Sequence, residues 1–268
     1  MHFHPTDSSP AASPLQVLQA GLRPVARAGA KPGLLVAGAT GPLGSEVLRR
    51  LAGSGAFSQT QVLAREPITA GLLQVGITVV GAGDIAAWPV YPLAVQTAVV
   101  MFEPSRLHHD RERALWTPVP GQLLALAHWL RRCGVQTLVL VLPHAQGSLP
   151  QALMQGLASI DEQAVTALGF ERVLLLRSAQ KPGATAAASA LEKLAAWMLS
   201  IVKYMIPASA QPLRPAKLAE FIDLALRELP AGTHVAGPEL LWQAAQARDM
   251  HKVVSAWLNT TEPTSAPS

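Results

Sequence analysis

Cysteine, charge and long apolar runs are all scarce in this sequence. Cys133 is the only cysteine among 268 residues, so the chain cannot form an internal disulfide. Charged residues make up 14% of the chain and apolar residues 50%, a balance that argues against general disorder. No apolar run approaches the roughly 20 residues that a membrane-spanning helix requires, so we expect no membrane association.

The N-terminal residues also lack the features of a secretion signal. Residues 1–7 contain neither a basic stretch nor an apolar core, and together with the single cysteine this predicts a cytoplasmic protein. The net charge of +4 comes from scattered lysines and arginines, with no basic run interleaved with aromatic residues. We therefore expect no nucleic-acid partner, whereas a mild positive charge suits a site for a pyrophosphate or a 2′-phosphate.

Three regions of the chain differ in composition. Residues 1–32 are rich in proline, alanine and serine, which predicts a flexible N-terminal arm. Between residues 33 and 258, short apolar runs alternate with helical patterns. This alternation predicts an α/β domain with a doubly wound parallel sheet and helices on both faces. The polar residues 259–268 predict a disordered tail.

The apolar periodicity places the individual elements. We expect strands at residues 34–37, 61–65, 77–80, 94–102, 137–142, 173–176 and 233–236. We expect helices at residues 44–51, 121–133, 151–168, 190–205 and 215–229, and a final helical piece after Gly237. His108-His109-Asp110 lies between these elements without further ligands near it in sequence, so we expect a solvated loop there and no metal site.

A glycine-rich loop joins the first strand to the first helix. It runs Gly38-Ala39-Thr40-Gly41-Pro42-Leu43-Gly44, a GxxGxxG pattern. In a strand-loop-helix context, the first glycine allows a tight turn, the second lets a pyrophosphate approach the backbone, and the third lets the helix pack against the strand. Free N–H groups and the positive end of the helix dipole would face the phosphates. The loop therefore predicts a dinucleotide as ligand, with Thr40, Pro42 and Leu43 beside the glycines.

The end of the second strand decides between NADP(H) and NAD(H). Arg65 falls where an arginine would bind a 2′-phosphate, so we predict NADP(H), although a solvated surface arginine is the alternative. Glu66, next to it, could hold a ribose hydroxyl and leaves NAD(H) possible. Asp84, after the third strand, is expected either to contact the adenine or simply to form a turn.

With these segments in place, the chain resembles the atypical short-chain dehydrogenases/reductases, and within them the NAD(P)H-binding proteins related to TIP30 and their bacterial relatives. The stretches that carry the resemblance occur in family order over most of residues 33–243. They are residues 35–44, 83–84, 168–177, 212–219 and 234–240. The resemblance implies one extended Rossmann domain, in which about residues 178–258 form a small wall on the substrate side.

The chain departs from this family at the catalytic pair. Enzymes of the superfamily carry Tyr-x-x-x-Lys on one helical face, where the tyrosine exchanges a proton with the substrate oxygen and the lysine lowers its pKa. The resemblance aligns Met154 with the tyrosine and Ala158 with the lysine. Independently of that alignment, the two tyrosines of the chain, Tyr91 and Tyr204, are not followed by lysine four residues later.

His144 follows the strand at residues 137–142, where the family has a serine. An imidazole can exchange protons near neutral pH, so His144 is a weak candidate for a catalytic residue. The alternative is a polar histidine in a loop. Apolar residues between Trp197 and Ile206 share a helical face, which predicts either a cover for the sheet or a contact with a protein partner or a second copy of the chain.

Three functions are compatible with this sequence. The intact glycine loop and the missing catalytic pair favour a non-catalytic NADP(H)-binding protein that acts as a sensor, scaffold or assembly factor. An NADPH-dependent oxidoreductase with a different proton donor is the alternative. A Rossmann-shaped interaction protein that has lost the nucleotide is the third, and the intact loop argues against it.

Overall fold

A computed structural model describes residues 31–68, 75–90, 94–103, 105, 110–144, 163–179 and 213–260. Several sequence predictions lie outside these residues: the arm up to residue 30, most of the helix at 151–168, the helix at 190–205, and the tail from residue 261. The described residues belong to one compact unit, Lys31–Ser268. Among them, no helix is both long enough and apolar enough to cross a bilayer.

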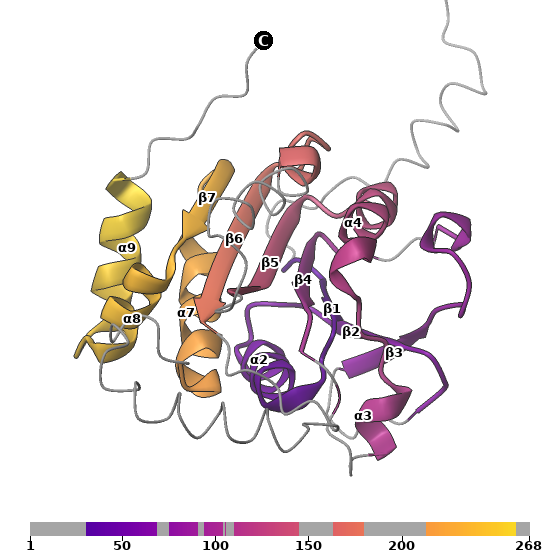
Figure 1. The fold of residues 1–268 in the computed structure, drawn as a ribbon. Helices are drawn as coiled ribbons and strands as arrows, with labels where there is room; N and C mark the ends of the chain where they lie inside the picture. Colours follow the sequence, from indigo (N-terminus) through magenta and orange to yellow (C-terminus); the bar gives the residue numbers. More distant parts are fainter. Residues whose placement is uncertain are drawn as a thin grey trace, which may run out of the picture. The chain divides into compact units, whose positions relative to one another are not determined.

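The centre of this unit is a parallel sheet of seven strands (Figure 1). In chain order the strands are β1 (Leu34–Ala37), β2 (Thr60–Ala64), β3 (Val75–Val79), β4 (Thr97–Met101), β5 (Thr137–His144), β6 (Arg172–Ala179) and β7 (Gly232–Ala236). Their order across the sheet is β3-β2-β1-β4-β5-β6-β7, and every neighbouring pair is parallel. The order reverses between β1 and β4, so the predicted doubly wound Rossmann fold is confirmed.

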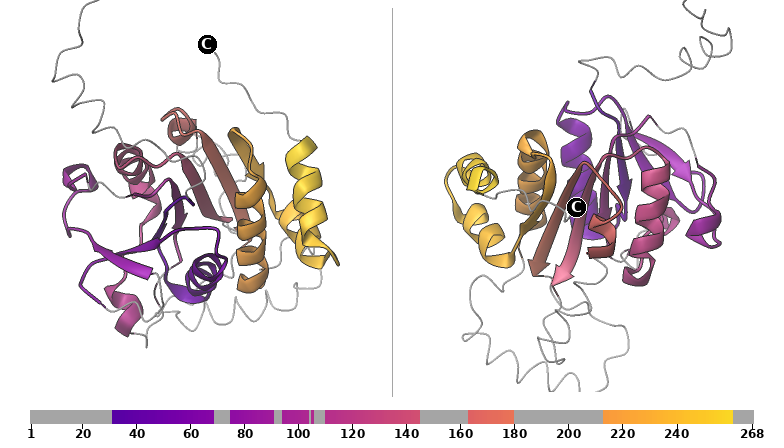
Figure 2. Two further views of the ribbon diagram at one scale, coloured as in Figure 1. Left: turned by 180° about the vertical axis from the view of Figure 1, so that it is seen from behind. Right: turned by 90° about the horizontal axis from the view of Figure 1, so that it is seen from above.

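Helices cover both faces of the sheet (Figure 2). One face carries α2 (Gly41–Gly53), α7 (Pro215–Glu228), α8 (Pro238–Gln246) and α9 (Met250–Thr260), whose apolar side chains share one buried core with Leu34 and Val36 of β1. The other face carries α4 (Leu123–Arg132), which packs on Leu35 and Ala37 of the same strand. Alternate residues of β1 thus enter two separate cores, and all four are fully buried, as expected of a central parallel strand.

The predicted strands are all present, with their ends shifted by a few residues. β5 and β6 extend beyond their predicted apolar cores and pair along eight positions, from Thr137 with Arg172 to His144 with Ala179. Helix α2 begins at Gly41 instead of residue 44 because Thr40 has extended dihedral angles and Pro42 suits a first helical turn. Helix α9 continues through Thr260, so residues 259 and 260 of the predicted tail are helical, and the rest of that tail lies outside the described residues.

The sequence pattern did not predict one short helix that the structure contains. Helix α3 (Asp110–Ala114) begins at the last residue of the His108-His109-Asp110 segment, for which a solvated loop is expected; it follows β4 and lies at the end of the sheet toward which β6 points (Figure 1). His108 and His109 lie outside the described residues. The five residues of α3 are too few to show an apolar period, which is why the sequence pattern did not indicate a helix.

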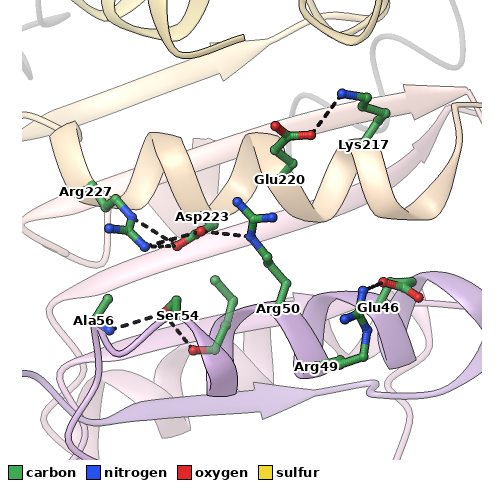
Figure 3. A network of polar contacts seen from close by, with 10 residues as sticks. Glu46, Arg49, Arg50, Ser54, Ala56, Lys217, Glu220, Asp223 and Arg227 are labelled. Carbon is green, nitrogen blue, oxygen red and sulfur yellow. Dashed lines mark hydrogen bonds and ion pairs between the residues drawn. The ribbon is translucent and has the colours of Figure 1, made fainter. Parts of the chain in front are cut away.

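A buried carboxylate joins α2 to α7 (Figure 3). The Asp223 side chain is only 4% exposed and accepts hydrogen bonds from Nε of Arg50 at 2.9 Å and from Nε and Nη2 of Arg227 at 3.1 Å. Two guanidinium groups compensate for the loss of water around one carboxylate. The contact joins α2, which follows the glycine loop, to α7, which precedes β7 in the chain.

Asp223→Asn should lower the free energy of unfolding by about 2 kcal/mol, because it removes charge-assisted hydrogen bonds at a buried acceptor while the arginines remain partly solvated. Urea denaturation followed by circular dichroism measures this change. Glu46→Gln is the matched control, since the more exposed Glu46–Arg49 pair forms within α2 and does not reach α7 (Figure 3), and it should have little effect. Equal losses in the two variants would contradict a special role for Asp223.

Candidate functional site

The glycine loop has the backbone conformation that its sequence requires. Gly38 and Gly41 have positive φ angles of 76° and 68°, a region that favours glycine. A Cβ on Gly38 would lie 2.0 Å from the carbonyl oxygen of Met101, and one on Gly44 would lie 2.6 Å from the carbonyl oxygen of Gly38. The first and third glycines are therefore needed for packing of β1 against β4 and of α2 against the loop.

The free N–H groups of this loop donate to carboxylates of the chain itself. The N–H of Gly41 donates to Oε2 of Glu112 at 3.1 Å, and the N–H of Leu43 donates to Oε2 of Glu103 at 2.7 Å. Pro42 has no N–H, and the N–H of Gly44 bonds to the carbonyl oxygen of Thr40 at 3.1 Å within the helix. The donors at the start of α2 are thus satisfied by two glutamates.

Thr40 ties the loop to the segments that carry these glutamates. Its hydroxyl donates to the backbone carbonyl of Glu103 and lies 3.0 Å from the hydroxyl of Thr117. The side chain therefore does not cap its own helix, and Thr40 is fully buried. Glu112 is only 7% exposed, so the second glutamate belongs to the interior of the protein.

Residues 114–118 cross the C-terminal ends of β1 and β2, and we call them the covering segment. The segment pairs antiparallel with the end of β2: the N–H of Arg65 donates to the carbonyl of Ala114 at 2.7 Å, and the N–H of Trp116 donates to that of Leu63 at 2.9 Å. In doubly wound folds the ligand crevice lies beyond the C-terminal strand ends where the strand order reverses, which here is between β1 and β4. The covering segment borders that position on the side of β1 and β2.

Aromatic packing anchors the covering segment. Trp116 is 6% exposed and meets Trp88 edge to face at 5.0 Å between ring centroids; Trp88 in turn meets Trp129 of α4 at 5.3 Å. The carbonyl of Trp116 also accepts the N–H of Gly38 at 3.1 Å. Because aromatic pairs of this geometry contribute beyond their buried area, the segment is an integral part of the core on this face.

A cavity of about 540 Å³ opens beside the covering segment. Its lining contains none of the seven loop residues and consists of Arg65, Glu66, Phe102, Ser105, Arg113, Ala114, Leu115, Thr117, Pro118 and Val119. The exposed Arg65 thus follows β2, as predicted, and lines this cavity, which meets the loop through Thr117, whose hydroxyl lies 3.0 Å from that of Thr40. The proposed 2′-phosphate contact of Arg65 stays a prediction.

The remaining candidate residues lie apart from the loop. The Asp84 side chain accepts the N–H of Ala86 at 3.1 Å and caps a short 3-10 helix, η1 (Ile85–Ala87), which corresponds to the turn-forming alternative. Its contact with adenine stays a prediction. His144 is the last residue of β5, and its side chain lies outside the described part of the molecule. In the ranges that the structure describes, no group of three or more potential ligands could hold a metal ion.

The two glutamates were not singled out from the sequence, although one signal was available. Glu103 follows β4 by two residues, and β4 lies next to β1 in a doubly wound sheet, so a residue just beyond β4 has to face the glycine loop. No comparable signal existed for Glu112, because its approach to the loop depends on the path of the chain between β4 and α4.

No family model matches this chain, and neither does any curated protein sequence. Solved structures match it at low identity. The triphenylmethane reductase of Citrobacter sp., solved with NADP(H), is 17% identical with a TM-score of 0.46, and the match covers 76% of this chain and 69% of that one.

Two further structures match in a similar way. UDP-N-acetylglucosamine 4-epimerase from Bacillus cereus is 15% identical with a TM-score of 0.45, and the match covers 80% of this chain and 83% of the epimerase. The Bordetella bronchiseptica enzyme WbmG, solved with NAD, is 15% identical with a TM-score of 0.41, and the match covers 91% of this chain and 84% of the enzyme. Sequence identities and TM-scores this low indicate neither the activity nor the cofactor of this chain.

The packing of the loop predicts a large effect of Gly38→Ala. We expect it to lower the free energy of unfolding by more than about 3 kcal/mol, because alanine is strained at positive φ and its methyl group would collide with a backbone carbonyl. Gly55→Ala is the control: φ is 66° there, but nothing lies within 4 Å of an added Cβ. The control should lose only about 1 kcal/mol. The two variants are compared by chemical denaturation. If Gly38→Ala and Gly55→Ala lose similar free energies of unfolding, backbone strain alone accounts for the effect at Gly38.

Proposed function

We propose that this chain is a non-catalytic protein on a short-chain-dehydrogenase-type scaffold, a nucleotide sensor, scaffold or assembly factor rather than a hydride-transfer enzyme. The observation that carries the proposal is that the loop amides donate to Glu103 and Glu112. An enzyme that binds a dinucleotide in every cycle needs these donors free. Here the conformation of the protein satisfies them internally.

The composition of the chain supports the same function. A reductase has to donate a proton to the carbonyl oxygen as negative charge develops there, and a positioned donor contributes about 10²–10⁴-fold in rate. No Tyr-x-x-x-Lys pair occurs anywhere in the sequence. Met154 and Ala158, which the family resemblance places at the two positions, can neither donate a proton nor adjust the pKa of a donor.

The ligand that we propose for the scaffold is NADP(H), with NAD(H) as the alternative. Gly38, Gly41 and Gly44 keep the loop geometry, and Thr40, Pro42 and Leu43 complete the first turn of α2. Arg65 lies at the C-terminal end of β2, where a guanidinium can pair with a 2′-phosphate. The glutamates have to leave the loop amides before a pyrophosphate can bind, so we expect weak binding by the wild-type protein.

Arg65 should provide the discrimination between the two dinucleotides. We expect wild-type protein to bind NADPH more tightly than NADH, and Arg65→Ala to reduce that ratio by about tenfold or more, since a charge-assisted hydrogen bond contributes about 1.5–3 kcal/mol. Calorimetric titration with each dinucleotide measures the ratio. Arg132→Ala, a change of the same kind on α4, is the control and should leave it unchanged. Equal affinities in the wild type would refute the assignment of Arg65.

The absence of catalysis is tested with substrates. We expect negligible oxidation of NADPH with a panel of aldehydes, ketones and quinones, followed by loss of nicotinamide absorbance. Robust turnover by the wild type would refute a non-catalytic function.

A second candidate function, an NADPH-dependent oxidoreductase with a different proton donor, rests on the position of His144. This residue ends β5 and therefore stands at the same edge of the sheet as the loop. Turnover that is lost in His144→Ala would make His144 the catalytic acid. Turnover that survives in His144→Ala would place the catalytic site elsewhere.

A further inference from the structure

The start of α2 offers few donors to an anion, and each one is taken. Pro42 contributes none, the N–H of Gly44 is used within the helix, and the N–H groups of Gly41 and Leu43 donate to Glu112 and Glu103. A pyrophosphate at this loop would need the same two donors. Competition for donors is therefore the first reason that phosphate and glutamates exclude each other.

The second reason that a phosphate and the glutamates exclude each other is the space that the Glu103 side chain occupies. A Cβ built on Gly41 would lie 2.5 Å from the carboxyl carbon and Oε2 of Glu103. The carboxyl group thus occupies the surface of Gly41, the glycine whose missing side chain would let a pyrophosphate approach the backbone. A phosphate and this carboxyl group cannot occupy the same volume.

The third reason that a phosphate and the glutamates exclude each other is their like charge. An ionised carboxylate brings negative charge to the positive end of α2, and a pyrophosphate diester brings one negative charge on each phosphate. Like charges at hydrogen-bond distance from the same donors repel strongly in a partly buried site. The glutamates imitate the ligand in charge as well as in position.

We infer that Glu103 and Glu112 form an internal latch that occupies the pyrophosphate position of the glycine loop and blocks dinucleotide binding until the carboxylates leave. Glu112 is buried on α3, which leads directly into the covering segment, whereas Glu103 is only partly buried at the end of β4. Glu103 is therefore the part of the latch that can be removed with the smaller disturbance. The inference rests on the proposed function in its choice of NADPH as the ligand.

The test compares NADPH binding by wild-type protein, Glu103→Ala and Glu103→Gln in calorimetric titrations. Glu103→Ala, which removes both bulk and charge, should bind NADPH at least about tenfold more tightly than the wild type. Glu103→Gln, which keeps the shape and removes the charge, should show a smaller gain. If Glu103→Ala does not fold, as judged by circular dichroism, the gain in Glu103→Gln decides alone.

Glu171→Gln is the matched control, because Glu171 is an exposed glutamate directly before β6, at the edge of the sheet opposite to the glycine loop. It removes the same charge and should change NADPH affinity by less than about twofold. Unchanged NADPH affinity in the Glu103 variants, or an equal gain in Glu171→Gln, would overturn the latch.

The same variants separate the latch from the proposed function. Tighter NADPH binding by Glu103→Ala together with turnover of the substrate panel would support the latch and refute the non-catalytic function. If Glu103→Ala shows unchanged NADPH affinity and no turnover of the panel, the latch is overturned and the non-catalytic function stays in place.

Discussion

The N–H groups at the start of α2 impose the constraint on which this site depends. A helix cannot satisfy its first donors internally, so some acceptor has to lie beyond its N-terminus. Charged acceptors there gain from the helix dipole as well as from the hydrogen bond, and each such bond contributes about 1.5–3 kcal/mol. In dinucleotide-binding proteins the acceptor is a phosphate. In this chain it is a pair of glutamates, bonded to Gly41 and Leu43.

The architecture of the sheet explains why those glutamates can reach the loop. β4 pairs with β1, and the close approach of Gly38 to the carbonyl of Met101 leaves no room between them. The residues that follow β4 are thereby brought over the loop, and Glu103 is among them. The covering segment then returns across β2 and is held by Trp116, which places Glu112 from the other direction. The same geometry thus brings carboxylates to the helix N-terminus at which doubly wound folds bind phosphate.

Sequence patterns predicted the sheet well because its strands are short, have mostly apolar centres and alternate with helices or turns. β1 was located to the residue, and β5 and β6 differed at their ends, which lie outside the apolar runs. Patterns failed at α3, whose five residues cannot display a helical period. They gave no indication that Glu112 is buried, because a glutamate in a polar run is usually solvated, whereas this one is 7% exposed.

The sequence by itself determined the Rossmann fold, the glycine loop and the lack of a Tyr-x-x-x-Lys pair, since these depend on apolar periodicity, on glycines at set spacing and on residue types that can be counted. Only the tertiary structure decided what the loop amides bind. The acceptors come from positions about 60 and 71 residues away from the donors, and no local pattern relates them. A hydrogen bond between distant segments depends on the complete path of the chain, because that path alone determines which carboxylate arrives at which N–H group.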